Sequence, residues 1–333
     1  MDVPPPPGVS ETQIVEALER DWGLGVERLA YVPKGFGSYH WEAVTGEGGR
    51  RFVTVDDLTT KTWLGAAVEE NHRALRSCYR AAHELAERRG LSFVVAPLPD
   101  RHGEVVHRLS ARFALSVYPF VPGPAGRWGV QIGGDEARRV LRLLADLHGC
   151  EVETEVPDRG LEVGGRPLLE AALDELDRPC SAGPFSERAR AELAAHRGEV
   201  VRLLESFDDL AARFAAGGPV PVVCHGEPHP GNLIGGDDGI HLVDWDTVGC
   251  APAERDLWMF ELCPEVDLDF YEEITGRRID RRGLALYRLA WILEDLAAFV
   301  TVFRSPHELN AATQKAWDGL TGYLRGDQPR PYG

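Results

Sequence analysis

Residues 219–260 of the chain read PVPVVCHGEPHPGNLIGGDDGIHLVDWDTVGCAPAERDLWMF. This pattern predicts a short apolar strand over 220–224, a polar loop, and a strand restart at Leu233. After a Gly-Asp turn it predicts a second strand over 240–245, and then a helix that opens near Pro252. Rigid scaffolds usually present their chemistry at strand ends and in the loops that follow them. The histidine, carboxylate and amide side chains gathered here therefore indicate a functional site.

The segment HGEPHPGN at 225–232 carries side chains suited to chemistry. Asn232 and Asp244 would leave neighbouring strands joined by a tight turn, so their oxygens could converge. Mg²⁺ prefers such hard oxygen ligands and keeps room for waters and phosphate oxygens. Glu227 lies where it could orient or deprotonate an incoming hydroxyl group. His225, at the end of a buried strand, could hydrogen-bond to the backbone and hold the loop in shape.

Two other interpretations of this loop stay open. Two histidines spaced like His225 and His229 bind zinc well on a helix, but Pro228, Pro230 and Gly231 forbid a helix here. Alternatively, the loop is a proline-stiffened turn whose polar residues satisfy one another.

Length and charge limit the class of protein. At 333 residues the chain exceeds what one core comfortably spans, so two lobes are expected. A formal charge of -17 argues against nucleic acid or an anionic membrane and suits a cationic small molecule, although an acidic surface also keeps a protein soluble. No apolar run approaches the roughly 18 to 20 residues of a membrane span, and the first residues do not resemble a secretory signal. The six scattered cysteines form no CxxC pair, which predicts reduced thiols and a cytoplasmic location.

The first 120 residues predict a small lobe that follows a disordered, proline-rich tail over 1–9. A helix over 11–22 with Ser10 as its N-cap should precede an antiparallel meander. Gly35, Gly37 and Ser38 lie between the first two strands, where a glycine-rich loop can fold over a phosphate chain. The strands are predicted over 28–32, 39–45, 51–55, 93–97, 105–109 and 113–121, with a long helix over 63–89.

The segment YPFVPG at 118–123 is typical of a stiff connector, so residues 121–333 are predicted as a second, mostly helical lobe. Its helices are predicted over 135–148, 168–176, 186–215, 266–275, 284–303 and 307–324, with Ser186 as a cap. Glu294 and Asp295 interrupt the unusually apolar helix over 284–303 and could bind the ammonium groups of a substrate. The expected fold class is α+β.

The segment HGEPHPGN followed by LVDWD resembles the catalytic and metal-binding loops of the aminoglycoside phosphotransferase family, which has a protein-kinase-like fold. YPFVPG resembles the family's interlobe hinge, and LLADLHG resembles its first large-lobe helix. APAERDLWMF resembles the segment after the metal aspartate, and YRLAWILEDLAAF resembles a late substrate-lobe helix. Order and spacing agree from about Leu29 to Phe299, and the nearest branch resembles the spectinomycin phosphotransferase-like proteins.

The resemblance implies a two-lobed fold and transfer of the γ-phosphate of ATP, or of GTP, to a hydroxyl group of a small cationic molecule, as in antibiotic resistance. It gives Glu227 the position of the catalytic base with His225 beside it, and makes Asn232 and Asp244 the Mg²⁺ ligands. The other implied roles are phosphate covering (Gly35, Gly37, Ser38), adenine binding by backbone (Phe120, Val121), acceptor binding (Asp246, Glu294, Asp295) and bracing of the catalytic loop (Asp256).

Two departures from the family pattern matter. The base is normally aspartate, and the extra methylene of Glu227 moves the carboxylate, where errors of about 1 Å can cost roughly 100-fold. The family's third-strand lysine is replaced by Thr54. Lys34 or Lys61 could substitute for it, although solvent-exposed lysines are the simpler explanation. Two alternative functions therefore stay open: a pseudokinase-like nucleotide- or ligand-binding protein with little turnover, and a metabolite kinase unrelated to antibiotics.

Overall fold

The structure is a computed structural model that describes residues 4–33, 38–46, 48–61, 63–65, 67–127, 129–130, 133–236, 239–261, 263 and 266–326. Two compact units are present. The first comprises Met1–Arg127, Arg138–Asp158 and Val222–Cys250, and the second comprises Trp128–Ala137, Arg159–Pro221 and Ala251–Gly333. The lobe boundary expected after residue 120 stays a prediction. Gly35 and Gly37 of the predicted phosphate loop, and Lys34 beside them, lie outside the described residues.

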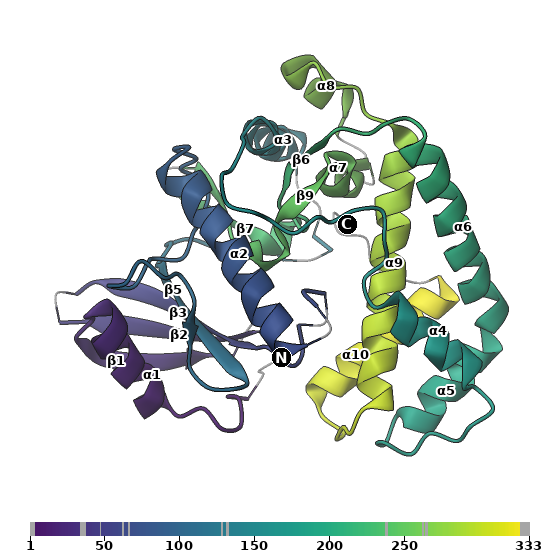
Figure 1. The fold of residues 1–333 in the computed structure, drawn as a ribbon, viewed down its shortest axis with the longest axis horizontal. Helices are drawn as coiled ribbons and strands as arrows, with labels where there is room; N and C mark the ends of the chain where they lie inside the picture. The colour runs from purple at the N-terminus through teal and green to yellow at the C-terminus, as the bar shows by residue number, and fades with distance from the viewer. Residues whose placement is uncertain are drawn as a thin grey trace. The chain divides into compact units, whose positions relative to one another are not determined.

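The first unit begins with a helix and an antiparallel sheet whose strand order is β1-β2-β3-β5-β4 (Figure 1). Helix α1 (Glu11–Ala17) continues into the π-helical turn η1 (Leu18–Trp22). The Ser10 hydroxyl accepts a hydrogen bond from the Gln13 amide, which confirms the predicted N-cap. The strands are β1 (Val26–Val32), β2 (Ser38–Thr45), β3 (Arg50–Asp57), β4 (His107–Arg108) and β5 (Phe113–Pro119).

The two faces of this sheet have different chemistry, because side chains alternate along each strand. One face forms an apolar core with α1 and η1, made of Ile14, Ala17, Leu18, Trp41, Ala43, Val53, Val55, Phe113, Leu115 and Val117. Thr54, Asp56 and Ser116 alternate with these core residues, and each is at most 5% exposed. Tyr79 of helix α2 (Val68–Glu87) donates to the Asp56 carboxylate at 3.5 Å. The strand period therefore turns a row of buried polar residues toward α2.

The first unit also contains the predicted loop and its flanking strands. Strand β6 (Pro221–Cys224) pairs with β9 (Gly249–Pro252), and β7 (Leu233–Gly236) is antiparallel to β8 (Gly239–Leu242). Helix α3 (Gly134–His148) follows the connector after β5.

Two predicted strands differ in the structure. The strand expected over 93–97 is wrong, because Val94 makes an isolated parallel bridge to Leu242. The backbone of Phe93 and Val95 hydrogen-bonds to Leu242, so this segment extends the edge of β8. The strand expected over 105–109 is reduced to β4.

The second unit is helical and is organised around α9 (Arg281–Arg304), which contacts α4, α5, α6, α7 and α10 (Figure 1). Contacts with five helices explain why most of this helix is apolar. The neighbouring helices are α4 (Arg166–Asp174), α5 (Ser186–Ala195), α6 (Arg197–Ala215), α7 (Glu254–Glu261), α8 (Asp269–Thr275) and α10 (Ala311–Arg325). Within the ranges that the structure describes, no helix is long and apolar enough to span a bilayer.

The single helix predicted over 186–215 is wrong, since α5 and α6 are separate and meet at His196. Ser186 is also not the cap that was predicted. Its hydroxyl donates to the Phe303 carbonyl at 2.8 Å, and Phe185 occupies the N-cap position.

Candidate active site

His225 is the structural centre of the loop between β6 and β7. Its imidazole is fully buried, and Nδ1 accepts a hydrogen bond from the Glu227 amide at 3.1 Å. Nε2 must then carry the ring proton, and it lies 2.9 Å from the Val243 carbonyl oxygen. His225 thus ties Glu227 to the residue before Asp244. Backbone bonding by His225 is confirmed, and since both of its nitrogens are used, the structure disfavours a zinc site that includes it.

Asn232 and Asp244 lie on adjoining segments, because the Val243 amide donates to the Asn232 carbonyl at 3.0 Å. The Asn232 side chain is 7% exposed, and its Nδ2 donates to the Glu227 carbonyl at 2.9 Å. This bond uses the amide nitrogen and leaves Oδ1 as the group that can coordinate a metal. The loop therefore presents an amide oxygen beside the Asp244 carboxylate.

Asp244 has a left-handed backbone with φ 68°, which no other non-glycine residue adopts within the described part of the chain. Such strain persists where the surrounding structure imposes it, and it clusters at functional sites. The Asp244 side chain reaches solvent, yet dehydration by the surrounding protein and the nearby Asp246 raise its pKa to about 8. A bound cation would favour the ionised form of this carboxyl group. With the Asn232 oxygen, the donor set fits Mg²⁺.

Lys61 supplies positive charge to this acidic group. Its side chain is 1% exposed, and its Nζ lies 2.7 Å from Asp246 Oδ2 and 2.9 Å from Asp56 Oδ1. Burial alone would lower its pKa, but Asp246 and Asp56 outweigh that effect and raise it. The explanation of Lys61 as a solvent-exposed lysine is therefore wrong. Asp246, predicted as an acceptor-binding carboxylate, is paired with this lysine.

Thr54 stands at the position of the family's lysine and brings no charge. It is 5% exposed, and its hydroxyl lies 3.2 Å from His40 Nδ1. Burial, with the nearby Lys61, lowers the pKa of His40 to about 4 against the effect of Asp56, so the imidazole is neutral at pH 7. Neither residue of this pair can attract a phosphate group.

The Glu227 carboxylate reaches solvent, with its side chain 32% exposed. Its Oε2 lies 3.9 Å from His229 Nε2. Burial and the neighbouring His225 lower the pKa of His229 to about 4, so this imidazole is neutral near pH 7. His229 therefore brings no positive charge to the Glu227 carboxylate, which is the candidate proton acceptor.

The connector after β5 pairs with β7. Gly126 donates its amide proton to the Leu233 carbonyl at 3.0 Å, and Gly235 donates to the Pro124 carbonyl at 3.2 Å. A cavity of about 500 Å³ opens here, within the usual size of a small-molecule pocket. Its walls are Phe120, Val121, Pro122, Gly123, Pro124, Gly235, Gly236 and His241. Both predicted adenine-contact residues thus line one cavity.

Gly123→Ala is expected to destabilise the first unit and weaken nucleotide binding. An added Cβ would lie 2.0 Å from the Gly235 carbonyl oxygen, and the φ of +141° is one that side chains rarely adopt. We expect a loss of about 2 kcal/mol or more in the free energy of unfolding. Urea unfolding and ATP titration measure both effects. Gly25→Ala is the control, because its Cβ would meet nothing within 4 Å, and equal behaviour of the two variants would contradict the assigned close approach.

The second unit holds the remaining predicted residues. Glu294 accepts a hydrogen bond from the Gly164 amide at 2.9 Å, and burial raises its pKa. Asp295 accepts from the Tyr323 hydroxyl. Burial, opposed by that hydrogen bond and supported by Glu294, raises the pKa of Asp295 to about 6. Asp256 is fully buried in α7. By accessible surface Glu294 is exposed and Asp295 is half-buried, and the two carboxylates form an acidic pair on α9.

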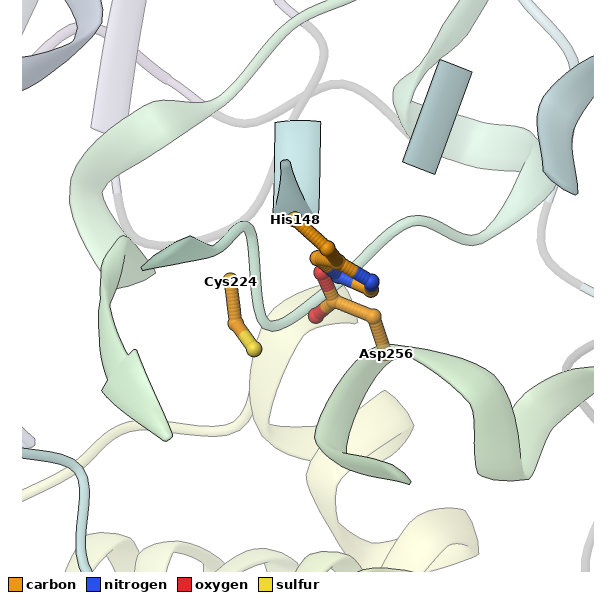
Figure 2. Close-up of side chains that lie close together, drawn as sticks. All are labelled: His148, Cys224 and Asp256. Atoms are coloured by element: carbon orange, nitrogen blue, oxygen red, sulfur yellow. The ribbon is translucent and has the colours of Figure 1, made fainter. Parts of the chain in front are cut away.

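Residues that sequence reasoning did not select also lie in the first unit. His148 of α3 and Cys224 of β6 are buried side by side, with a ring nitrogen within 4.8 Å of the sulfur (Figure 2). Asp56, the partner of Lys61, could have been found from the strand period, which places it on the same face as Thr54.

Comparison with known proteins identifies the family. Residues 28–287 match the family model described as "Phosphotransferase enzyme family". The chain belongs to this family. Its curated relative Protein StrN of Streptomyces griseus is 27% identical over 266 residues, which cover 73% of this chain and 74% of StrN.

Solved structures agree in fold. A spectinomycin phosphotransferase in complex with ADP and spectinomycin superposes with a TM-score of 0.69 at 19% identity, covering 98% of this chain and 97% of that one. Choline kinase LicA from Streptococcus pneumoniae gives a TM-score of 0.57 at 15% identity, covering 95% and 99%. The predicted α+β, two-lobed, protein-kinase-like fold is confirmed, and the chain is a phosphotransferase with an alcohol group as acceptor.

Proposed function

We propose that this phosphotransferase moves the γ-phosphate of ATP to a hydroxyl group of a small cationic molecule of the aminoglycoside or aminocyclitol type. One observation carries the proposal: the His225 ring joins the Glu227 amide to the Val243 carbonyl, so base and metal ligands share one framework. Phosphoryl transfer depends mainly on such positioning and on charge neutralisation.

Each residue of the loop has a distinct role in this proposal. Glu227 accepts the proton of the acceptor hydroxyl at its carboxylate. Asn232 Oδ1 and the Asp244 carboxylate hold Mg²⁺, which neutralises phosphate charge when it is bound. His225 positions Glu227 by accepting a hydrogen bond from its amide.

The nucleotide would occupy the cavity beside Phe120 and Val121, with adenine against the connector backbone. Ser38 begins β2 at the end of the predicted phosphate loop, whose Gly35 and Gly37 remain part of the proposal. Solved relatives contain ADP, or AMP-PNP with Ca²⁺, which supports an adenine nucleotide over GTP.

Glu294 and Asp295 are the proposed acceptor-binding residues, and the buried Asp256 keeps, as a proposal, the loop-bracing role that the resemblance implies. Two neighbouring carboxylates favour a cationic ligand, and the overall charge of -17 would attract one. Relatives act on spectinomycin and choline by their names, which supports the same substrate class here.

Asp295→Asn is expected to stabilise the protein at pH 8 and leave it unchanged below pH 4. The pKa of Asp295 is raised from 3.8 to about 6 in the folded state, so its ionisation opposes folding as pH rises through 6. The gain at pH 8 should be about 2 kcal/mol. The same variant should raise the KM for a cationic acceptor, most strongly above pH 6. Thermal unfolding and initial rates across pH test this, with exposed Asp318→Asn as control. A pH-independent difference would contradict it.

A direct test combines calorimetry with Mg²⁺ and ATP or GTP and a screen of phosphate transfer to aminoglycosides, spectinomycin, choline and amino alcohols. Transfer to a cationic alcohol is the expected result. Tight nucleotide binding without transfer to any acceptor would instead favour the pseudokinase-like alternative, which the replacements at Glu227 and Thr54 motivate. Transfer confined to choline or a simple amino alcohol would favour the metabolite kinase.

A further inference from the structure

Within the described ranges, Lys61 is the one lysine or arginine that is buried. Position 54, where the resemblance places a lysine, is a threonine in this chain. We propose that Lys61 takes over from that lysine as a positioning residue, which holds the start of β2, the end of β3 and the metal loop together for nucleotide binding. This inference rests on the proposed function. It names Lys61 as the positively charged residue that holds the proposed nucleotide site in shape.

The contacts of the Lys61 ammonium define how it acts. Nζ lies 3.2 Å from Ser38 Oγ, 2.9 Å from Asp56 Oδ1 and 2.7 Å from Asp246 Oδ2. Ser38 Oγ in turn donates to Asp56 Oδ1 at 2.6 Å. An ammonium group has three donors, and these three acceptors use all of them. Lys61 therefore acts through the residues that it holds.

The three acceptors, Ser38, Asp56 and Asp246, come from the start of β2, the end of β3 and the turn after Asp244. Ser38 is the first residue of β2, directly after the predicted phosphate loop. Asp246 lies in the 3-10 turn η3 (Trp245–Thr247), which begins immediately after Asp244. Without Lys61, the Asp56 and Asp246 carboxylates would be buried close together with like charge, which forces such groups apart. Lys61 thus links the first residue of β2 to the turn that follows Asp244.

The backbone explains how a lysine so far beyond Thr54 reaches this point. After β3 the chain turns, with the Thr60 amide donating to the Asp57 carbonyl at 3.1 Å. Asn71 of α2 fixes this turn through a 2.8 Å bond from Nδ2 to the Leu58 carbonyl. The turn returns Lys61 to the polar face of the sheet, where its ammonium group pairs with Asp56.

The test separates positioning from simple stabilisation. Lys61→Met should lower both the melting temperature and the affinity for Mg²⁺–ATP, because it leaves two unpaired buried carboxylates. The double variant Lys61→Met with Asp56→Asn should recover much of the stability, while its Kd for Mg²⁺–ATP stays at least tenfold above wild type and its KM for ATP rises more than its kcat falls. Arg139→Met, which removes a positive charge at an exposed position of α3, should match wild type in every measurement.

Two results overturn the inference. Wild-type affinity for Mg²⁺–ATP in Lys61→Met, or wild-type affinity in the double variant once its stability returns, would make Lys61 a structural cation only. If the wild-type protein itself bound no nucleotide, the proposed function would fail first, so the two failures are distinguishable.

Discussion

Asp244→Asn should lower the affinity for Mg²⁺–ATP by about 100-fold, or roughly 3 kcal/mol, and remove measurable phosphate transfer. The variant removes one formal charge from the proposed metal site and keeps an oxygen in place. Asparagine tolerates the left-handed backbone that Asp244 adopts at φ 68°, so the loop should keep its conformation. Calorimetry with ATP at several Mg²⁺ concentrations measures the loss, which should shrink as Mg²⁺ is raised.

Stability distinguishes loss of metal binding from loss of fold. Without metal, Asp244→Asn should be at least as stable as wild type, because it relieves repulsion with Asp246. Asp146→Asn changes the same charge at an exposed position of α3 in the same unit and should leave affinity unaltered. Unchanged Mg²⁺–ATP affinity in Asp244→Asn would remove Asp244 from the metal site.

Local sequence patterns were sufficient to predict most strands of the five-stranded sheet and the loop over 225–232. The period of two predicted β2, β3 and β5 closely. The proline-glycine pattern of residues 225–232 correctly excluded an α-helix, and the loop contains only the 3-10 turn η2 (Pro230–Asn232). Segments without such a pattern were predicted less well. The chain over 93–97 has strand composition, but a single pairing to Leu242 decides its state, and that pairing is a tertiary event.

Lys61 shows why part of the site could not be predicted from sequence. A lone lysine in a polar segment is usually exposed, because burying an ammonium group is costly unless it is paired. Its pairing partner Asp246 is 185 residues away, so no local pattern reports the contact. The break between α5 and α6 at His196 could not be predicted locally either, because the sequence on both sides favours helix.

Glu227 is the departure from the family pattern that bears most directly on turnover. Two hydrogen bonds of the loop use the main chain of Glu227: its amide donates to His225 Nδ1, and its carbonyl accepts from Asn232 Nδ2. A change of this side chain keeps both of these bonds. The carboxylate can be tested separately from the framework.

Glu227→Gln should lower kcat by about 10² to 10⁴-fold while the Kd for Mg²⁺–ATP stays within error of wild type, because an amide cannot accept the hydroxyl proton. Glu227→Asp should also lower kcat, by up to about 100-fold, because it withdraws the carboxylate from a site shaped around glutamate. Single-turnover rates with the acceptor found by the screen measure both changes, and Glu273→Gln on α8 serves as control. Unchanged kcat in Glu227→Gln would exclude it as the base. A gain in Glu227→Asp would instead show that glutamate attenuates an otherwise ordinary phosphotransferase.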